Sequence, residues 1–253
     1  MTEAVLLAGG RGSRLGGAEK AELQHAGRPL VTQWCAALAA RGVAVVVVGP
    51  AGLAPLVPPG TVLIQEQPRY SGPAAALYAG WSVLERARRG AGAAGGHASA
   101  GVAGSDVEGT PGGGTGSGEY LAVLAVDIVK PPALLDWLFG QLGAGGEATS
   151  LIPVDRSGRD QLTCSLHAVG PLRNRMAPLK AADLVGSSLR RLLTDAAGER
   201  QGAGEPAPSV LRPVLPEDLG ADVDTPADAR RLGVVTPRPG GHQDPRGAGS
   251  AKR

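Results

Sequence analysis

A glycine-rich, basic segment near the start of the chain carries the most distinctive chemistry. Five glycines fall within the nine residues 9–17, interleaved with Arg11 and Arg14, and Lys20 follows shortly after. Glycine backbone can turn its N–H groups toward a ligand, and successive N–H groups form a concavity that binds anions. Neighbouring cations favour a polyphosphate in such a concavity. The segment therefore predicts a nucleotide phosphate site.

The spacing within this segment excludes two common nucleotide sites. A Walker loop needs Lys directly after its last Gly and then Ser or Thr, but Lys20 lies three residues beyond Gly17 and precedes Ala21. Gly10, Gly12 and Gly16 miss the spacing of the dinucleotide fingerprint. No Tyr-x-x-x-Lys pair is present either, so a dehydrogenase is disfavoured.

An aspartate at the end of a predicted strand supplies the second chemical landmark. The apolar run 119–126 predicts a buried strand, and Asp127 follows it, where parallel sheets bind ligands. The proline pair at 131–132 predicts the next helix, so Asp127 stands too far back to cap it. Magnesium takes oxygen ligands, often one or two carboxylates together with substrate phosphates. Asp127 is therefore a candidate magnesium ligand.

A second aspartate stands just outside a predicted helix start. Thr225, Pro226 and Asp228 have the pattern of an N-cap, a proline at the first helical position and an acidic third residue. That pattern leaves Asp224 unexplained. Two roles remain equally open for Asp224: it could bind a metal ion, or it could order the loop.

The chain resembles a known enzyme family at these positions. The stretch 7–20, L-A-G-G-R-G-S-R-L-G-G-A-E-K, is similar to the signature of nucleotidyltransferases with the sugar-nucleotide-transferase fold, and most of all to the molybdenum cofactor guanylyltransferases. Weaker likeness occurs at 66–73, where the family more often has Asp in place of Glu66, and at 222–228. Asp127 is not followed by the family's D-x-P pattern, which leaves the role of Lys130 open.

The resemblance implies an activity and a set of site residues. It implies transfer of GMP from GTP to the phosphate of molybdopterin, with magnesium assistance and release of pyrophosphate. Lys20, Arg14 and Asp127 would be catalytic, and Asp127 and Asp224 would hold the metal. The residues expected to bind the nucleotide are Leu7, Ala8, Gly9, Gly10, Gly12, Lys20, Glu66, Gly72, Pro73 and Asp127.

Partners and alternatives follow from the same resemblance. The substrates would be GTP and molybdopterin, and the product could be handed to molybdoenzymes or their chaperones. A transferase that uses CTP or another phosphorylated acceptor, and a non-catalytic nucleotide-binding relative, remain alternatives. Arg159 and Gln161 fall in the region that faces the acceptor in the family, but an ordinary turn with solvated charges is the favoured interpretation there.

The elements that must position these residues alternate between strand and helix. Strands are predicted at 4–8, 43–48 and 61–66, and helices at 30–41 and from 73 onward. Such alternation indicates an α/β fold with a mostly parallel sheet and right-handed crossovers. Together with the resemblance it implies three layers, with helices on both faces of a Rossmann-like nucleotide-diphospho-sugar transferase fold.

One domain is expected over residues 1–235. Within it, 12 of the 29 residues at 90–118 are glycine, which predicts a flexible insertion without a core. Two further segments of the fold are predicted beyond it, a strand pair at 149–155 and 161–169. Residues 236–253, rich in Pro, Gly and charge, are expected to be a disordered tail.

The amino-acid composition disfavours several other classes of protein. Hydrophobic residues make up 43% of the chain and aromatic residues 3%, so the core must be built from Val, Leu and Ala. A net charge of +2, with dispersed basic residues, disfavours nucleic-acid binding. No apolar run or basic leader predicts a membrane span or a signal peptide. The isolated Cys35 and Cys164 fit a reducing cytoplasm, and the scattered histidines give no support for a covalent intermediate.

Overall fold

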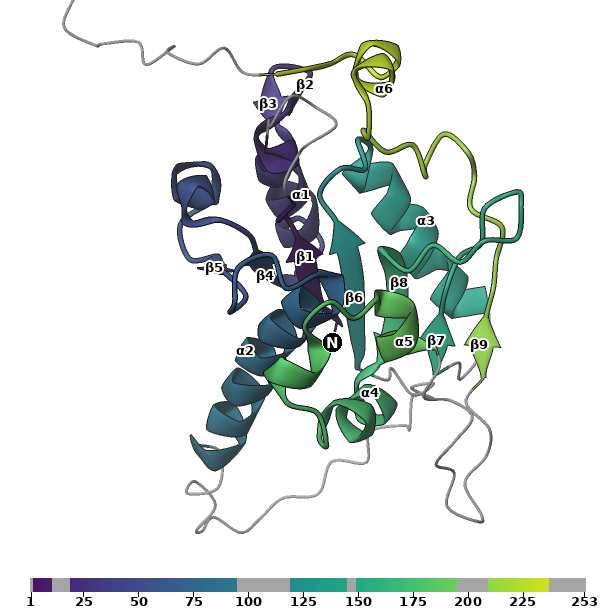
Figure 1. Cartoon of the computed structure of the whole chain (residues 1–253). Helices are drawn as coiled ribbons and strands as arrows, with labels where there is room; N and C mark the ends of the chain where they lie inside the picture. Colours follow the sequence, from purple (N-terminus) through teal and green to yellow (C-terminus); the bar gives the residue numbers. More distant parts are fainter. Residues whose placement is uncertain (1, 11–18, 95–118, 145–148, 195–208, 237–253) are drawn as a thin grey trace, which may run out of the picture.

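The computed structural model describes residues 2–10, 19–94, 119–144, 149–194 and 209–236. Its main sheet has seven strands in the order β5-β4-β1-β6-β8-β7-β9. Among these described strands, β8 alone runs antiparallel to its neighbours β6 and β7, and the other pairs are parallel (Figure 1). The bounds are β1 (Thr2–Leu7), β4 (Ala44–Val48), β5 (Val62–Ile64), β6 (Tyr120–Ala125), β7 (Ser150–Leu151), β8 (Cys164–Ala168) and β9 (Val210–Leu211). The predicted mostly parallel sheet is confirmed.

The central strands are short apolar runs because both of their faces are covered. In β1, Ala4, Val5 and Leu6 are fully buried. Val5 lies opposite Val46 of β4 on one side and Val123 of β6 on the other. Side chains that branch at Cβ pack well on a pleated surface, and a sheet buried on both faces needs no polar alternation.

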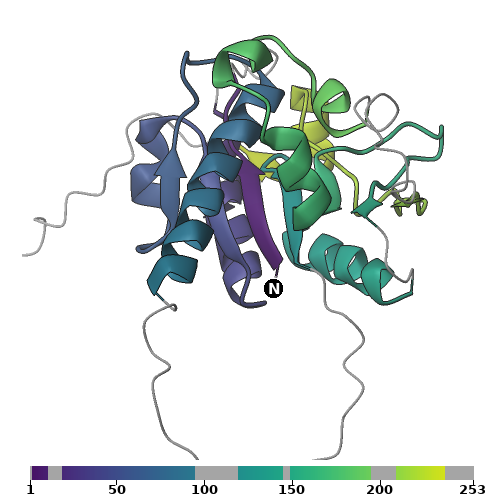
Figure 2. The same ribbon diagram turned by 90° about the horizontal axis from the view of Figure 1, so that it is seen from below.

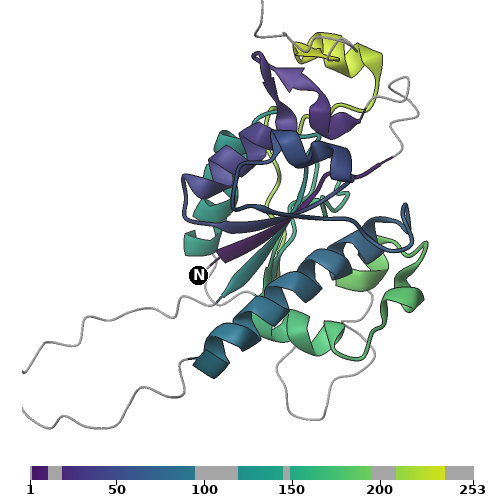
Figure 3. The ribbon, with the colours of Figure 1, turned by 90° about the vertical axis from the view of Figure 1, so that its left-hand side faces the viewer.

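Helices cover both faces of the sheet and give the three layers expected (Figure 3). On one face lie α1 (Leu30–Ala39) and α3 (Pro131–Ala144), and their apolar side chains form one core cluster with the sheet. On the other face lie α2 (Pro73–Ala94), α4 (Val169–Met176) and α5 (Leu189–Leu193), which share a second cluster (Figure 2). Each cluster contains one buried tryptophan, Trp34 in the first and Trp81 in the second.

Gly80 lets α2 pack closely on the sheet. A Cβ added at Gly80 would lie 2.7 Å from Cγ1 of Val5, a separation that side chains do not tolerate. The same Cβ would lie 3.1 Å from Cγ2 of Val48. The helix is thus held against β1 and β4, with its first residue, Pro73, near the ends of these strands.

A small second sheet lies beyond the carboxyl end of β6, next to α6 (Pro226–Arg231) (Figure 1). It contains β10 (Val234–Val235), β2 (Gln24–His25) and β3 (Arg28–Pro29). Ala26 and Gly27 join β2 to β3 with positive φ angles of 50° and 73°, as a tight hairpin turn requires. Short 3-10 helices are η2 (Lys20–Glu22), η3 (Ala51–Leu56) and η5 (Ala181–Leu184). This small sheet was not predicted from the sequence.

The predicted boundaries agree with the structure to within a few residues, with one extension. Helix α2 continues to Ala94, into the range 90–118 assigned to the insertion. The rest of that range, Gly12, Arg14 and the tail beyond Thr236 lie outside the described residues. Cys35 and Cys164 are free and buried. None of the helices described is at once long and apolar enough to cross a membrane.

Candidate active site

The predicted phosphate segment begins at the carboxyl end of β1. The N–H of Ala8 donates to the carbonyl of Val48 over 2.8 Å, which keeps the chain beside β4 to the last residue of the strand pair. Gly9 then passes close to Gly49, and a Cβ on Gly9 would lie 3.8 Å from the Cα of Gly49. The two strands therefore end in adjacent glycines. Leu7, Ala8, Gly9 and Gly10 stand at the edge of the sheet where ligands bind in open α/β folds.

Lys20 joins two aspartates that are distant from it in sequence. Its Nζ donates to Oδ2 of Asp127 over 2.9 Å and to Oδ1 of Asp224. Burial alone would lower the pKa of Lys20, but the charges and hydrogen bonds of Asp127 and Asp224 outweigh it and raise the pKa. The ammonium group therefore remains charged, and the structure brings together three of the residues predicted from sequence.

Backbone pairing between two loops sets the positions of these aspartates. The N–H of Val223 donates to the carbonyl of Asp127 over 3.1 Å, and the N–H of Val129 donates to the carbonyl of Ala221 over 3.4 Å. Ile128 and Asp222 form an antiparallel bridge between the same segments. The loop after β6 and the segment before α6 thus pair as a short ribbon, and their carboxylates meet at one end of the sheet.

Asp222 completes a carboxylate cluster, defined as Asp127, Asp222 and Asp224. One oxygen from each lies within 4.8 Å of the others. Side chains two apart on an extended segment point to the same side, and the fully buried Val223 between them points to the other. Partial removal from water and the negative charges of Asp127 and Asp224 raise the pKa of Asp222. Asp222 was not predicted from the sequence as a site residue, although its two-residue spacing from Asp224 is a signal that they share one side of the chain.

Trp34 supports the cluster from the core. Its side chain is fully buried on α1, and its Nε1–H donates to the carbonyl of Ile128 over 3.1 Å. That carbonyl belongs to the residue directly after Asp127. The indole therefore holds the loop of the first aspartate against the rigid helix, a role that no motif in the sequence indicates.

The predicted helix start at 225–228 is present. Asp228 Oδ2 accepts from the N–H of Thr225 over 3.0 Å, and Thr225 Oγ1 accepts from the N–H of Asp228 over 3.2 Å. Hydrogen bonds from Thr225 and Arg231 lower the pKa of Asp228 to about 2. This reciprocal cap uses neither oxygen of Asp224, which is left to the cluster.

The second predicted nucleotide segment, 66–73, forms a loop of its own after β5. Glu66 is 7% exposed, and its Oε1 accepts from the N–H of Tyr70 over 2.9 Å, so the carboxylate shapes the loop. Gly72 has a φ of +100°, and Pro73 begins α2. Strands β4 and β1 lie between β5 and β6, which separates this loop from Asp127 by about 14 Å across the sheet.

Two further residues have ordinary structural surroundings. Lys130 reaches Asp218 over 3.4 Å at the surface, and α3 begins directly after it, so Asp127 is not the cap of that helix. Asp155 Oδ2 accepts from the amide of Gln161 over 3.1 Å, and its Oδ1 accepts from the N–H of Arg159 over 3.0 Å. These contacts make residues 155–161, the segment that the family resemblance placed near the acceptor, a compact turn.

This arrangement of residues occurs in a chain that matches a known protein family. The model of the MobA-like NTP transferase domain matches residues 4–203. The chain belongs to this family. It is a nucleotidyltransferase, and the match includes the glycine segment, Lys20 and Asp127, whereas Asp222 and Asp224 lie beyond its end. Comparison with curated protein sequences finds no match.

Solved structures share the fold at low sequence identity. Rv0371c from Mycobacterium tuberculosis H37Rv has a TM-score of 0.55 at 18% identity, covering 91% of this chain and 96% of that one. The homologue of Rv0371c from Mycobacterium sp. strain JC1 has a TM-score of 0.53 at 19% identity, covering 91% of this chain and 94% of that one. These similarities show the α/β fold and nothing finer.

Proposed function

We propose that the protein transfers GMP from GTP to the phosphate of molybdopterin and releases pyrophosphate. The observation that carries the proposal is the contact of Lys20 with Asp127 and Asp224 at the sheet end where the glycine segment begins. Membership of the MobA-like family and the resemblance of residues 7–20 to the guanylyltransferase signature support this particular nucleotide and acceptor.

The carboxylate cluster fits a magnesium ion. It offers three oxygens within 4.8 Å of one another, and hard carboxylate oxygens are the ligands that magnesium takes in nucleotide sites. Three carboxylates facing one ammonium leave unbalanced negative charge, which favours a further cation. Asp127 and Asp224 would hold the ion, with Asp222 beside them, and the bound ion would neutralise charge on the reacting phosphates.

The chain's own groups would then position the triphosphate. Backbone N–H groups of the segment after β1 bind phosphate oxygens, and Lys20 moves its ammonium from the aspartates to the phosphates. An oxygen of the acceptor phosphate attacks the α-phosphorus of GTP in line. The bond from that phosphorus to the bridging oxygen breaks, and pyrophosphate leaves with the electron pair. Lys20 and Arg14 stabilise the charge that builds up on this leaving group.

The loop at 66–73 would receive the base. The span of about 14 Å between the strands that precede Glu66 and Asp127 suits a nucleotide lying across the strand ends. A buried carboxylate accepts hydrogen bonds from the N–H groups of guanine. Oε1 of Glu66 binds the N–H of Tyr70, and its second oxygen would accept from the base.

Pyrophosphate release with each of the four common triphosphates, molybdopterin and magnesium tests the proposal. We expect release with GTP and formation of the guanine dinucleotide. Lys20→Ala should lose at least about 100-fold in turnover, because it removes a charge aligned on the leaving group. The surface variant Lys180→Ala removes the same charge away from the site and should keep full turnover.

Other outcomes would overturn the proposal in distinct ways. Preference for CTP, or turnover only with another phosphorylated acceptor, would make the protein a different transferase of the same family. Binding of GTP without pyrophosphate release under any of these conditions would identify a non-catalytic relative.

A further inference from the structure

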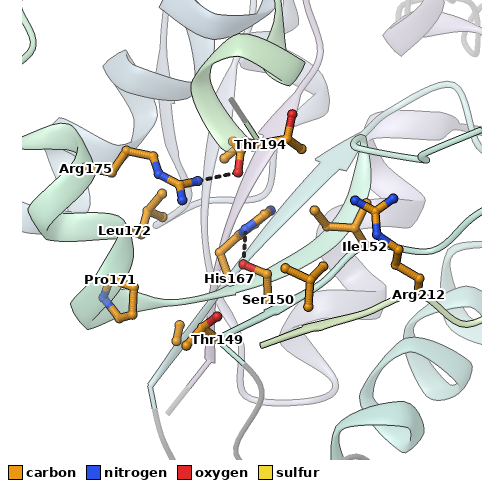
Figure 4. A pocket seen from close by; sticks show the side chains of 12 residues that line it. Thr149, Ser150, Ile152, His167, Pro171, Leu172, Arg175, Thr194 and Arg212 are labelled. Carbon is orange, nitrogen blue, oxygen red and sulfur yellow. Dashed lines mark hydrogen bonds between the residues drawn. The ribbon is translucent and has the colours of Figure 1, made fainter. Parts of the chain in front are cut away.

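A cavity of about 110 Å³ lies on the opposite half of the sheet, where α4 and the end of α5 cover β7, β8 and β9 (Figure 4). This is several times the volume that one water molecule needs. Its walls include Arg175, Arg212, His167 and Ser150. Polar and cationic groups therefore face a space large enough for a small ligand.

Arg175 gives the cavity its positive charge. Its guanidinium donates to the carbonyl of Leu193, and within the described ranges no carboxylate pairs with it. Arg212 and Arg190 share the single carboxylate of Asp160. One carboxylate thus faces two of these cations, and Arg175, whose guanidinium has further N–H groups, has no carboxylate partner among the described residues.

The His167 network, defined as Ser150, His167 and Ser165, fixes what the opposite wall can accept. Ser165 Oγ donates its proton to the carbonyl of Leu162 over 2.8 Å, so at 2.8 Å from Nε2 it must accept the proton of His167. Nδ1 is then unprotonated and accepts from Ser150 Oγ over 3.1 Å (Figure 4). The hydroxyl proton of Ser150 is used, and its oxygen can only accept from a ligand.

The cavity is separate from the carboxylate cluster. His167 lies opposite Leu121 on β6. Asp127 stands six residues further along the chain, which corresponds to roughly 20 Å at the rise of a strand. A triphosphate held at the carboxyl end of β1 therefore does not reach Arg175.

We propose that this cavity is a second anion site that binds a phosphate group in its monohydrogen form. The N–H groups of Arg175 donate to phosphate oxygens in the planar geometry that guanidinium and phosphate share. The remaining phosphate O–H donates to Ser150 Oγ. The ligand is inorganic phosphate, because a monoester at neutral pH is mostly a dianion that has no P–O–H to donate.

Thermal unfolding in a phosphate series, at constant ionic strength and neutral pH, tests the site on the whole chain. We expect phosphate to raise Tm, since a ligand that binds only the folded state stabilises it. Sulfate has no O–H at this pH, so we expect it to bind at least about tenfold more weakly and to need correspondingly higher concentrations for the same rise in Tm. Glycerol phosphate, a monoester that is mostly without a P–O–H at this pH, should raise Tm less than inorganic phosphate does. An equal rise would overturn the proposed donation to Ser150 Oγ.

Three variants locate the effect. Arg175→Gln should abolish the Tm rise, whereas Arg191→Gln, which removes an exposed charge from α5, should retain it. Lys20→Ala should also retain it, because it alters only the triphosphate site. Retention of the full rise in Arg175→Gln, or its loss in Lys20→Ala, would overturn the proposal. If Arg175→Gln does not fold, Ser150→Ala decides: equal responses to phosphate and sulfate are expected, and an unchanged preference for phosphate overturns the proposal.

Discussion

The carboxylate cluster and the His167 network lie at two ends of the same sheet. They differ in charge, in exposure to water and in how completely their polar groups are hydrogen-bonded. In the cluster, three carboxylates face one ammonium, partly open to water, on loops held together by backbone pairing. In the network, His167 is 2% exposed, neutral and hydrogen-bonded at both nitrogens within regular strands. The cluster leaves its charge unbalanced, which is what a cationic ligand needs. The network satisfies both ring nitrogens of His167 with neutral partners, and the oxygen of Ser150 is left to accept from the proposed phosphate.

The largest effect should come from Asp127→Asn. We expect a loss of about 100-fold or more in kcat/KM, since the proposed function places this charge at the reacting phosphates. The free energy of unfolding should not fall, because repulsion with Asp222 and Asp224 is relieved. Pyrophosphate release and urea unfolding measure the two quantities. The matched control is the surface variant Asp218→Asn, and a fall in stability as large as the loss of function would break the contrast between the two regions.

Lowering the pH should lower the stability of the fold through His167 in the network. Burial, followed by the charge of Arg175, lowers the pKa of His167 from 6.5 to about 3. Between these values the unfolded chain binds a proton that the folded chain does not, so stability falls as the pH falls. The slope should be about 1.4 kcal/mol per pH unit, and the contribution is complete above pH 6.5.

Urea unfolding across this pH range, compared with His167→Gln, isolates that slope from the titrating carboxylates. The variant should lose the extra dependence while its stability at neutral pH falls. Parallel pH profiles for the two proteins would show that His167 does not stay neutral in the folded state.

Trp34→Phe should give the smallest effect, and it should lower both the stability of the fold and the turnover. It removes the donor to the carbonyl of Ile128, so we expect a loss of about 1–3 kcal/mol in the free energy of unfolding. Turnover should fall several-fold because the loop of Asp127 is less firmly held. Trp81→Phe is the control in the other core. It should lower stability without changing kcat, and equal kcat values in both variants would separate Trp34 from the site.

The central architecture was predictable because its signals are local. Short apolar runs mark β1 and β4, and the Thr225–Asp228 pattern marks the start of α6. Lys20 and Asp127 follow neighbouring strands β1 and β6, so their approach follows from the expected parallel sheet.

What escaped prediction depends on contacts between distant segments. β2 and β3 have two residues each, too few to show a period. Asp222 joins the cluster through its bridge with Ile128, and Trp34 through a hydrogen bond to the same residue. The two-residue spacing of Asp222 and Asp224 indicates that they share one side of the chain, but nothing in the sequence indicates the pairing of the two loops or the hydrogen bond of the buried indole.

The reach of Lys20 along the chain has a consequence for synthesis. Its partners lie 107 and 204 residues further on. Closing segments that far apart carries an entropic penalty that only the packed domain offsets. On the ribosome, a chain that has not yet extended past Asp224 cannot assemble the carboxylate cluster. The cluster and its contact with Lys20 therefore form late, when the last segments of the domain have been made.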